Sequence, residues 1–548
     1  MRRMLISQLV GWWTPVLSKV DCCFWYRCLQ RTGQALSLPK VYFVGTPPKH
    51  ACMSLSGLFI GVRWKYLPLK SIPVRLLVIL MVLAVMTGAG HAQEMTPEPT
   101  PPAEPGNIYG VVEGMWFPDL TCELGVGWER IIFDWSQHQP NGPDDWFTLS
   151  VDDRWLKAAN ACNREVIAIV KNVPAWATDG TPGPGVPRGL DLPVDDPGNL
   201  WAGFMRKTAE YYASRGVQRF IILNEPDITR ETYGFEFEGE LEDYFLALKV
   251  GYLAAKQGNP NAVIHLAATT YWHDANTGRR LYMDRLLERI AQDPDAEQHD
   301  EYFSVFSLHL YFRTETIPQI VGLMREMLDK NGMEDKAIWI NELNASPNLD
   351  PNWPVVRPQY QVTLEQQSSF LIQATTLALA SGVERIAVYK LVDQGLPEGA
   401  ESFGLLTPGL EDRLPRPAFY TWKMIAHHLT NIADAEVVST ETVDVVKLYH
   451  ADGRLTIAAW ARTAVPTTVT ISATDGKAYL LDEVGSLMLL RPQDQVYRLQ
   501  LPGATCDEKD GCAVGGRVSL LVQSQGETEI HEMRDEQSVR LSFGDSIP

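Results

Sequence analysis

Residues 220–227 read Phe-Ile-Ile-Leu-Asn-Glu-Pro-Asp, an apolar run that ends in polar residues and a proline. A short apolar run of this kind is typical of a strand buried on both faces, as in a parallel sheet. A helical pattern follows at 241–257, and Gly258 comes directly after it, where a left-handed helix cap would need glycine. The segment therefore predicts one strand followed by one helix.

The same alternation of strand and helix continues along residues 107–430. Strands are predicted at 108–112, 130–135, 166–170, 220–223, 263–267, 304–310, 337–340 and 385–389. Further helices are predicted between them at 200–214, 279–292, 317–330 and 365–381, with Gly216, Gly332 and Gly382 just past three of the ends. Eight such units favour a (β/α)8 TIM barrel, with an open doubly wound sheet as the alternative.

A different pattern begins after His428. Apolar and polar residues alternate at 443–449, 455–460, 467–472 and 518–523, which predicts strands that bury one face. Residues 431–548 are therefore expected to form a small C-terminal β-sandwich domain. Its expected role is that of a structural brace, with a carbohydrate-binding module as the alternative.

The formal net charge of −19 over 548 residues is unevenly distributed. Residues 1–92 contain 11 basic residues and one acid, Asp21, so the remainder of the chain is strongly acidic. An acidic surface repels nucleic acid and anionic lipid, and we expect no nucleic-acid partner. The composition, 45% hydrophobic and 21% charged, is that of a globular protein.

The change of composition near residue 92 has the features of a secretory signal. Arg75 precedes an apolar run, and small residues follow up to Ala92. Residues 71–92 are therefore predicted to be a cleaved signal peptide, with a membrane anchor through 72–89 as the alternative. The protein is expected to be secreted or extracytoplasmic, directed by the signal-like segment 74–92.

Two further segments flank this signal. Residues 1–70 precede it, and because a signal normally begins the chain, we expect them to be a non-native N-terminal extension. Residues 93–106 are rich in proline and are predicted to be an extended linker.

Four cysteines lie after the linker. Export to an oxidising compartment would allow Cys506 and Cys512 to close a hairpin. Cys122 and Cys162 either pair or remain buried thiols, and the sequence leaves both pairings open.

Polar residues stand at the ends of three predicted strands, where the chemistry of a TIM barrel is located. Asn224 and Glu225 end the fourth, His309 and Tyr311 end the sixth, and Glu342 ends the seventh. The two glutamates would thus stand on one rim of the barrel, facing each other across its mouth. Glycosidic bond cleavage needs such a pair, one to protonate the leaving oxygen and one to attack the anomeric carbon or activate water.

These residues resemble those of the clan A retaining glycoside hydrolases, the (β/α)8 group that includes families 5 and 39. The resemblance rests on Asn-Glu-Pro at 224–226 and on Glu342 at the end of the seventh strand. It implies that Glu225 is the acid/base, that Asn224 holds the sugar 2-hydroxyl, and that Glu342 is the nucleophile.

Shorter motifs extend the resemblance over residues 107–430. Tyr311 matches the tyrosine that positions the nucleophile in the clan, and its spacing from His309 is similar to family 5. Arg130 opens an Arg-x-x-x-x-Trp-x-x-x-x-Pro pattern that resembles the second strand of several members, where the arginine lies beside the nucleophile. The Pro-Ala-Trp-Ala sequence around Trp176 is similar to family 39.

The chain departs from the clan at the sugar-binding surfaces. Many members end the eighth strand with a tryptophan beneath the sugar, where this chain has Tyr389 followed by Lys390. Family 5 has a histidine after the third strand, where this chain has Lys-Asn-Val at 171–173. Because aromatic faces stack on sugars, the remaining candidate sugar platforms are Trp176, Trp272 and Trp353.

Taken together, the motifs predict a retaining glycoside hydrolase that cleaves β-glycosidic bonds of a plant or microbial oligosaccharide or polysaccharide by double displacement. A carbohydrate is the expected substrate, and no cofactor or metal is expected. The alternatives are a non-catalytic exported carbohydrate-binding protein on a degenerate barrel and a transglycosylase using the same site. Loops at 178–199 and 346–359 are expected to wall the cleft.

Overall fold

The computed structural model describes residues 107–543, apart from 233, 357, 359, 409–412, 507–510 and 535–536. The extension, signal and linker expected at 1–70, 71–92 and 93–106 therefore lie outside the described residues. Within the described part, no helix is both long and apolar enough to cross a membrane.

Eight parallel strands close into a barrel in which each strand pairs with the next and β8 pairs with β1. The strands are β1 (Tyr109–Val112), β2 (Trp128–Asp134), β3 (Glu165–Lys171), β4 (Val217–Ile222), β5 (Val263–His265), β6 (Val305–Tyr311), β7 (Ala337–Asn344) and β8 (Arg385–Val388). The TIM-barrel prediction is confirmed. The open-sheet alternative is wrong, because Gly110 of β1 pairs with Ala387 of β8 and closes the sheet.

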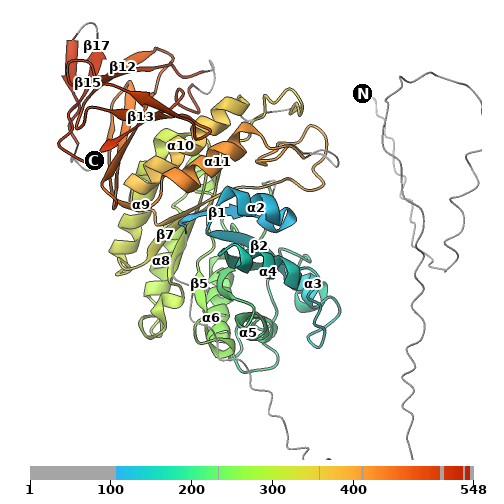
Figure 1. Cartoon of the computed structure of the whole chain (residues 1–548). Helices are drawn as coiled ribbons and strands as arrows, with labels where there is room; N and C mark the ends of the chain where they lie inside the picture. The colour runs from blue at the N-terminus through green and yellow to red at the C-terminus, as the bar shows by residue number, and fades with distance from the viewer. Residues whose placement is uncertain are drawn as a thin grey trace, which may run out of the picture. The chain divides into compact units, whose positions relative to one another are not determined.

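Helices connect the strands and surround the barrel (Figure 1). They are α2 (Pro118–Leu124), α3 (Trp135–His138), α4 (Asp153–Ala161), α5 (Leu200–Ala213), α6 (Leu241–Gly258), α7 (Trp272–Thr277), α8 (Tyr282–Ala291), α9 (Ile317–Lys330), α10 (Leu364–Ala380) and α11 (Pro417–His428). Local sequence sets several of their ends. The Thr363 hydroxyl accepts from the Gln366 backbone N–H at the start of α10, and the Gln366 side chain accepts from the Thr363 N–H in return.

Glycine has two different roles at the helix ends. Gly216, Gly332 and Gly382 have positive φ values of 84°, 73° and 85°, as expected for residues past a helix end. The expectation for Gly258 is wrong, because it is the last residue of α6 and Asn259 caps the helix. A Cβ at Gly258 would lie 2.2 Å from the backbone oxygen of Arg206, so glycine is needed there for the close approach of α6 to α5.

Two antiparallel sheets follow the barrel. The first has the order β14-β13-β16-β11-β10-β9 and the second the order β15-β12-β17-β18. Their strands are β9 (Ile432–Ser439), β10 (Val443–His450), β11 (Arg454–Ala461), β12 (Thr467–Ser472), β13 (Ala478–Leu481), β14 (Leu487–Leu490), β15 (Val496–Leu501), β16 (Ser519–Ser524), β17 (Ile530–Arg534) and β18 (Gln537–Arg540). Val445 and Ile457 of one sheet share a buried core with Val469 and Leu499 of the other, as in a β-sandwich.

The first sheet also packs against the barrel, where α10 contacts β9 and β10 (Figure 1). Because side chains alternate along a strand, Val445 faces the sandwich core while Val446 joins the core of the barrel. The Gln373 side chain of α10 donates to the Gly516 carbonyl at 2.8 Å, and the Arg313 backbone N–H donates to the Ala513 carbonyl at 2.9 Å. These contacts join the C-terminal β domain to the barrel.

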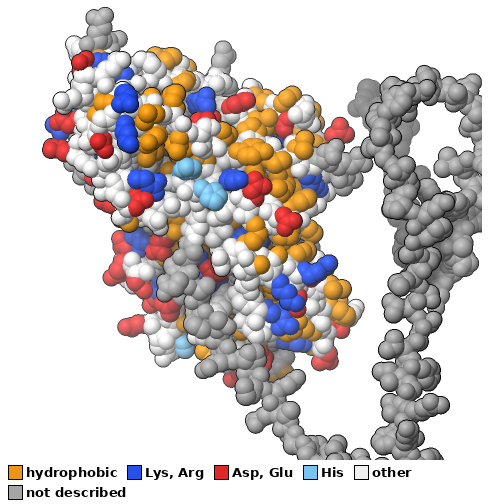
Figure 2. Space-filling view, in the orientation of Figure 1, with side chains coloured by type: hydrophobic (Ala, Val, Ile, Leu, Met, Phe, Trp, Pro, Cys, Tyr) orange, Lys and Arg blue, Asp and Glu red, His pale blue; other side chains and the backbone are white. Residues whose placement is uncertain are grey.

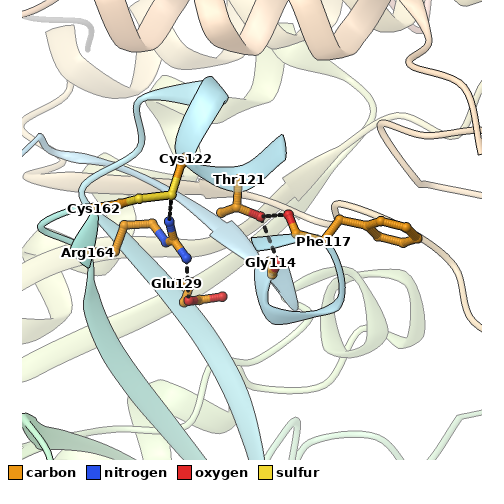
Figure 3. Close-up of a disulfide and its surroundings, with 7 residues drawn as sticks. All are labelled: Gly114, Phe117, Thr121, Cys122, Glu129, Cys162 and Arg164. Carbon is orange, nitrogen blue, oxygen red and sulfur yellow. Dashed lines mark hydrogen bonds and ion pairs between the residues drawn. A yellow bond between two sulfur atoms is a disulfide. The ribbon is translucent and has the colours of Figure 1, made fainter. Parts of the chain in front are cut away.

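Both candidate pairs of cysteines form disulfides, Cys122 with Cys162 and Cys506 with Cys512. The first joins α2 to the end of α4 across 40 residues (Figure 3), a span for which a crosslink contributes about 4 kcal/mol through the unfolded chain. Beside it, the guanidinium of Arg164 donates to the Cys122 sulfur at 3.1 Å and pairs with Glu129 at 3.2 Å, with both charged side chains fully buried.

The surface carries charges of both signs. On the face shown in Figure 2, acidic and basic side chains are interspersed with apolar ones rather than gathered into one large patch. The acidic excess of the chain after residue 92 is therefore not concentrated in a single patch on that face.

Candidate active site

A cavity of about 510 Å³ lies at the carboxyl-terminal ends of the barrel strands. Its lining residues are Glu113, Arg130, Ile132, Ile169, Lys171, Asn224, Glu225, Gly234, Glu236, Thr270, Trp272, Asn276, His309, Tyr311, Phe312, Arg313, Glu342, Tyr360, Tyr389, Glu401 and Phe403. All but two of the residues selected from the sequence line this single cavity, the exceptions being Trp176 and Trp353.

Glu342 stands at the centre of a buried set of donors. It lies within β7 and is 6% exposed. Arg130 of β2, itself buried, forms an ion pair with one of its carboxylate oxygens, and the Tyr311 hydroxyl of β6 donates to the other. Both oxygens are thus held by donors that suit an ionised carboxylate.

These donors determine the charge of Glu342. Burial by itself would raise its pKa, but the charge of Arg130, the nearby His309 ring and the hydrogen bond from Tyr311 outweigh burial and lower the pKa to about 2. Burial and the charge of Glu342 also raise the pKa of Tyr311 well above its ordinary value, so its hydroxyl keeps its proton and donates. At neutral pH Glu342 is therefore an anion in a buried position, as a nucleophile requires.

Glu225 has a different environment from Glu342. It follows β4, is more exposed than Glu342, and its Oε1 lies 2.7 Å from Nδ1 of His309. Nε2 of the same ring lies 3.4 Å from Nη1 of Arg130. Because a guanidinium only donates, Nε2 accepts, which places the ring proton on Nδ1, where it is donated to Glu225.

The two carboxylates are close together. The ligand atoms of Glu225, His309 and Glu342 all lie within 4.8 Å of one another, and His309 Nδ1 is 3.5 Å from Oε2 of Glu342. Retaining glycosidases have their two carboxyl groups about 5–5.5 Å apart, whereas inverting enzymes leave about 6.5–9.5 Å for a water molecule. One oxygen of Glu225 and one of Glu342 are therefore close enough to act on the same substrate atom.

The same three side chains are the group of converging ligand atoms found among the described residues that could hold a metal ion. Arg130 is in contact with Glu342, however, and a dication bound there would be placed beside a buried guanidinium. Metal binding at Nδ1 of His309 would also remove the proton that this nitrogen donates to Glu225. The donor set thus suits paired carboxylates better than a metal.

The backbone after β4 directs Asn224 and Glu225 into the cavity. Leu223 and Glu225 have positive φ values of 62° and 39°, which are unfavourable for residues other than glycine. Asn224 is 8% exposed, and its buried Oδ1 has no partner among the described residues. An unpaired buried acceptor at a cavity wall is suited to a ligand hydroxyl.

Asp227 anchors the loop that carries Glu225. Its Oδ2 accepts from the backbone N–H and the hydroxyl of Thr270, at 3.1 and 2.7 Å. Burial raises the pKa of Asp227 to about 6, and the charge of Glu225 adds to this effect. Asp227 is not among the residues predicted from the sequence to form the site, although it lies two positions after Glu225.

The tryptophans selected as sugar platforms have different positions. Trp272 begins α7 and lines the cavity, with the Arg313 guanidinium 4.9 Å from its ring centroid. Trp176 does not line the cavity; its ring packs edge-on against Trp135, and its N–H donates to the Gln139 carbonyl at 2.6 Å. Trp353 likewise donates to a backbone carbonyl, at 2.9 Å, rather than facing the described cavity.

Tyr389 lines the cavity at the end of β8, where many clan members have tryptophan. Its ring centroid is 5.9 Å from that of Tyr311 and 6.0 Å from that of Phe403. Glu113 and Lys390 form an ion pair next to it, and Lys171 forms one with Glu236.

Most of these charged wall residues are not marked by a motif in the sequence. Glu113 could have been found, since it directly follows β1 as the other site residues follow their strands. Glu236 and Glu401 lie far from any strand end, and no local signal marks them. Among the described residues of 178–199 and 346–359, none lines the cavity, so the expectation for these two loops is wrong. Segments after β4, β5, β6 and β8 form most of the walls instead.

Replacement of Arg130 by Met is expected to shift the acidic limb of kcat/KM upward. Without the guanidinium, burial dominates and raises the pKa of Glu342, so the nucleophile is protonated, and activity is lost, at a pH about 1–3 units higher than in the wild type. The pH dependence of kcat/KM measures this directly. Arg385→Met, which removes a buried arginine at the opposite end of the barrel, should leave the limb unchanged. An active Arg130→Met variant with an unshifted limb would contradict the assignment.

No protein-family model matches the sequence, and no curated protein matches it either. The structure, by contrast, is similar to solved structures of glycoside hydrolases. A family 39 glycoside hydrolase from the gut symbiont Bacteroides cellulosilyticus WH2 aligns with a TM-score of 0.57 at 14% identity, over 76% of this chain and 81% of that chain.

Two further structures align with similar coverage. SrfJ from Salmonella typhimurium has a TM-score of 0.51 at 13% identity, over 78% of this chain and 92% of that chain. The catalytic domain of GH30 xylanase C from Talaromyces cellulolyticus has a TM-score of 0.50 at 13% identity, over 78% of this chain and 99% of that chain. At these identities the likeness shows a shared fold, the closed barrel of eight parallel strands with its C-terminal β domain.

Proposed function

We propose that this protein is a retaining glycoside hydrolase that cleaves β-glycosidic bonds in an oligosaccharide or polysaccharide. The observation that carries the proposal is the convergence of Glu225 and Glu342, with ligand atoms within 4.8 Å, in one cavity. The shared fold with a family 39 glycoside hydrolase and a GH30 xylanase supports the same reaction class.

In the first step, an oxygen of Glu342 attacks the anomeric carbon of the bound sugar. The bond from that carbon to the glycosidic oxygen breaks, and Glu225 gives its proton to the leaving oxygen. Arg130 and Tyr311 keep Glu342 ionised beforehand. The product of this step is a glycosyl ester of Glu342 and a released alcohol.

In the second step, Glu225 is ionised and takes a proton from water. The water oxygen attacks the anomeric carbon, and the ester bond to Glu342 breaks. Each step inverts the anomeric carbon, so the two together retain its configuration. His309, which donates to Glu225 and lies 3.5 Å from Glu342, keeps both carboxylates in position throughout.

The configuration of the first-formed product tests the proposal. We expect proton NMR of a β-glycoside digest to show the β-anomer of the released sugar first, before mutarotation. A first-formed α-anomer would indicate an inverting enzyme. Failure to cleave any glycoside, combined with binding of oligosaccharides, would favour the carbohydrate-binding protein, and formation of longer oligosaccharides would favour the transglycosylase.

We also propose that the protein acts outside the cytoplasm. The two disulfides, Cys122–Cys162 and Cys506–Cys512, support this, because such bonds persist in oxidising compartments. N-terminal sequencing of the native protein is expected to begin near residue 93, after cleavage of the signal-like segment. A peptide from residues 1–60 in the native protein would contradict the proposed extension, and an intact 72–89 segment would indicate a membrane anchor.

A further inference from the structure

Glu113 lines the cavity on the side opposite Glu225 and forms an ion pair with Lys390, which is not itself among the lining residues. Nζ of Lys390 donates to Oε2 of Glu113 at 2.7 Å, and each side chain is 13% exposed. Glu113 lines the cavity, and Lys390 lies against the ring of Tyr389, with its Nζ 5.4 Å from the centroid. None of the steps proposed above uses this pair.

The backbone holds both residues firmly. Glu113 has a φ of 57° and a ψ of 39°, a left-handed conformation that is unfavourable for a side chain with a Cβ. Its N–H donates to the Arg130 carbonyl at 3.0 Å. The Lys390 carbonyl accepts from the Leu405 N–H at 2.9 Å. A glycine at 113 would avoid the unfavourable conformation. The chain nevertheless has a carboxylate there, which favours a function for that carboxylate.

The order of strands around the barrel indicates which part of a substrate would meet this pair. Glu342 must lie under the anomeric carbon, while Glu225 must lie beside the glycosidic oxygen that leaves. The sugar ring on the anomeric side of the scissile bond, the glycone, therefore extends from Glu342 away from Glu225. Because β4 carries Glu225 and β7 carries Glu342, that direction leads to β8 and β1, where Lys390 and Glu113 lie.

We propose that the Glu113–Lys390 pair recognises hydroxyl groups of the glycone and selects a neutral sugar; this inference rests on the proposed function. A carboxylate accepts and an ammonium donates, so the pair complements adjacent hydroxyls, which do both. One oxygen of Glu113 and one donor of Lys390 serve the pair, which leaves each group capacity for a sugar. Charge-assisted hydrogen bonds here take the place of the tryptophan found in many clan members.

The charges of the cavity favour a neutral glycone over a charged one. Glu113 and Glu401 would repel the carboxylate of a uronic acid. Lys390 would repel the ammonium of an amino sugar. The cations that line the cavity are already paired with acids, Arg130 with Glu342, Lys171 with Glu236 and Arg313 with Glu315.

The test compares matched substrates across Glu113→Gln and Lys390→Met. The substrates are the neutral 4-nitrophenyl β-glycoside that the wild type cleaves best, its mono-deoxy analogues and its uronic acid counterpart. Each variant is expected to lose about 100-fold in kcat/KM on the neutral glycoside. On the analogue that lacks the contacted hydroxyl, the kcat/KM of the same variants should be at most about threefold below that of the wild type. The wild type already lacks the interaction with this analogue, so the substitution removes nothing further.

The uronic acid substrate separates recognition from a structural role. Glu113→Gln removes a repelling charge and should raise the uronide-to-neutral ratio of kcat/KM by about tenfold, whereas Lys390→Met should lower it. Arg385→Met is the matched control, since it breaks a similarly buried ion pair, Arg385 with Glu165 at 2.6 Å, at the other end of the same strand. It should change kcat/KM on every substrate by one common factor.

The outcomes distinguish this inference from the proposed function. If Glu113→Gln and Lys390→Met behave like Arg385→Met, or change nothing, while Glu342→Gln abolishes cleavage, only the recognition role is overturned. If the wild type cleaves none of the glycosides, the proposed function fails and the recognition role fails with it.

Discussion

Replacement of Glu342 by Gln is expected to lower kcat by about 10⁴-fold or more on every glycoside that the wild type cleaves. Gln keeps the shape of the side chain but is a poor nucleophile, so the glycosyl ester does not form. The change also leaves the buried guanidinium of Arg130 without its partner charge, which costs about 3–5 kcal/mol. Activity and thermal unfolding should therefore be measured together.

A matched control separates lost chemistry from lost stability. Glu165 is a partly buried carboxylate that pairs with Arg219 and Arg385 away from the cavity. Glu165→Gln should be destabilised yet retain its turnover. Azide provides the positive evidence, because in Glu342→Ala it can attack the anomeric carbon from the face that Glu342 occupied. The product would be an α-glycosyl azide. An undiminished kcat in Glu342→Gln would refute the assignment of Glu342 as the nucleophile.

Replacement of Glu225 by Gln is expected to lower kcat by about 10²–10⁴-fold, and the loss should depend on the leaving group. A nitrophenol departs without protonation, so the first step survives and the glycosyl ester of Glu342 accumulates. An alcohol leaving group needs the proton, so natural oligosaccharides should be cleaved far more slowly. Comparing aryl glycosides with oligosaccharides measures this dependence, and a burst of nitrophenol reports the accumulated ester.

Azide again distinguishes the roles of the two glutamates. In Glu225→Ala it attacks the glycosyl ester from the side of the missing base, and because this is the second inversion, the product is a β-glycosyl azide. The opposite anomers from Glu225→Ala and Glu342→Ala would assign the two roles separately. The same anomer from both variants, or an equal loss on all leaving groups in Glu225→Gln, would contradict the assignment.

The strand ends account for most of what could be predicted about the site. Position at the end of a predicted strand points to Asn224, Glu225, His309 and Glu342, whereas Arg130 is found through its resemblance to a clan motif; the structure places all five in one cavity. Position at a strand end is a local property, and barrel closure brings all such ends to one rim. This is why residues more than 100 positions apart, such as Asn224 and Glu342, can be grouped from the sequence.

Predictions that rest on the type of side chain alone, rather than on its position at a strand end, agree less well with the structure. Trp176 sits in a motif similar to family 39, yet its ring packs on Trp135 and its N–H binds a backbone carbonyl. A tryptophan in a loop buries a large apolar surface whether or not it meets a sugar, so its sequence position cannot separate packing from binding. Gly258 is a similar case, because close helix packing and a left-handed cap both require glycine.

The sequence by itself determined the barrel, the β domain after it and the position of the two glutamates at strand ends. Apolar periodicity and strand ends depend only on short stretches of sequence. Only the tertiary structure decided the distances between the site residues and the ionisation of Glu342. The 4.8 Å convergence of Glu225 with Glu342, the donors that hold Glu342 ionised, and the pairing of Glu113 with Lys390 depend on side chains from different strands. Their distances and burial are set by closure and packing of the whole barrel, which no short stretch of sequence contains.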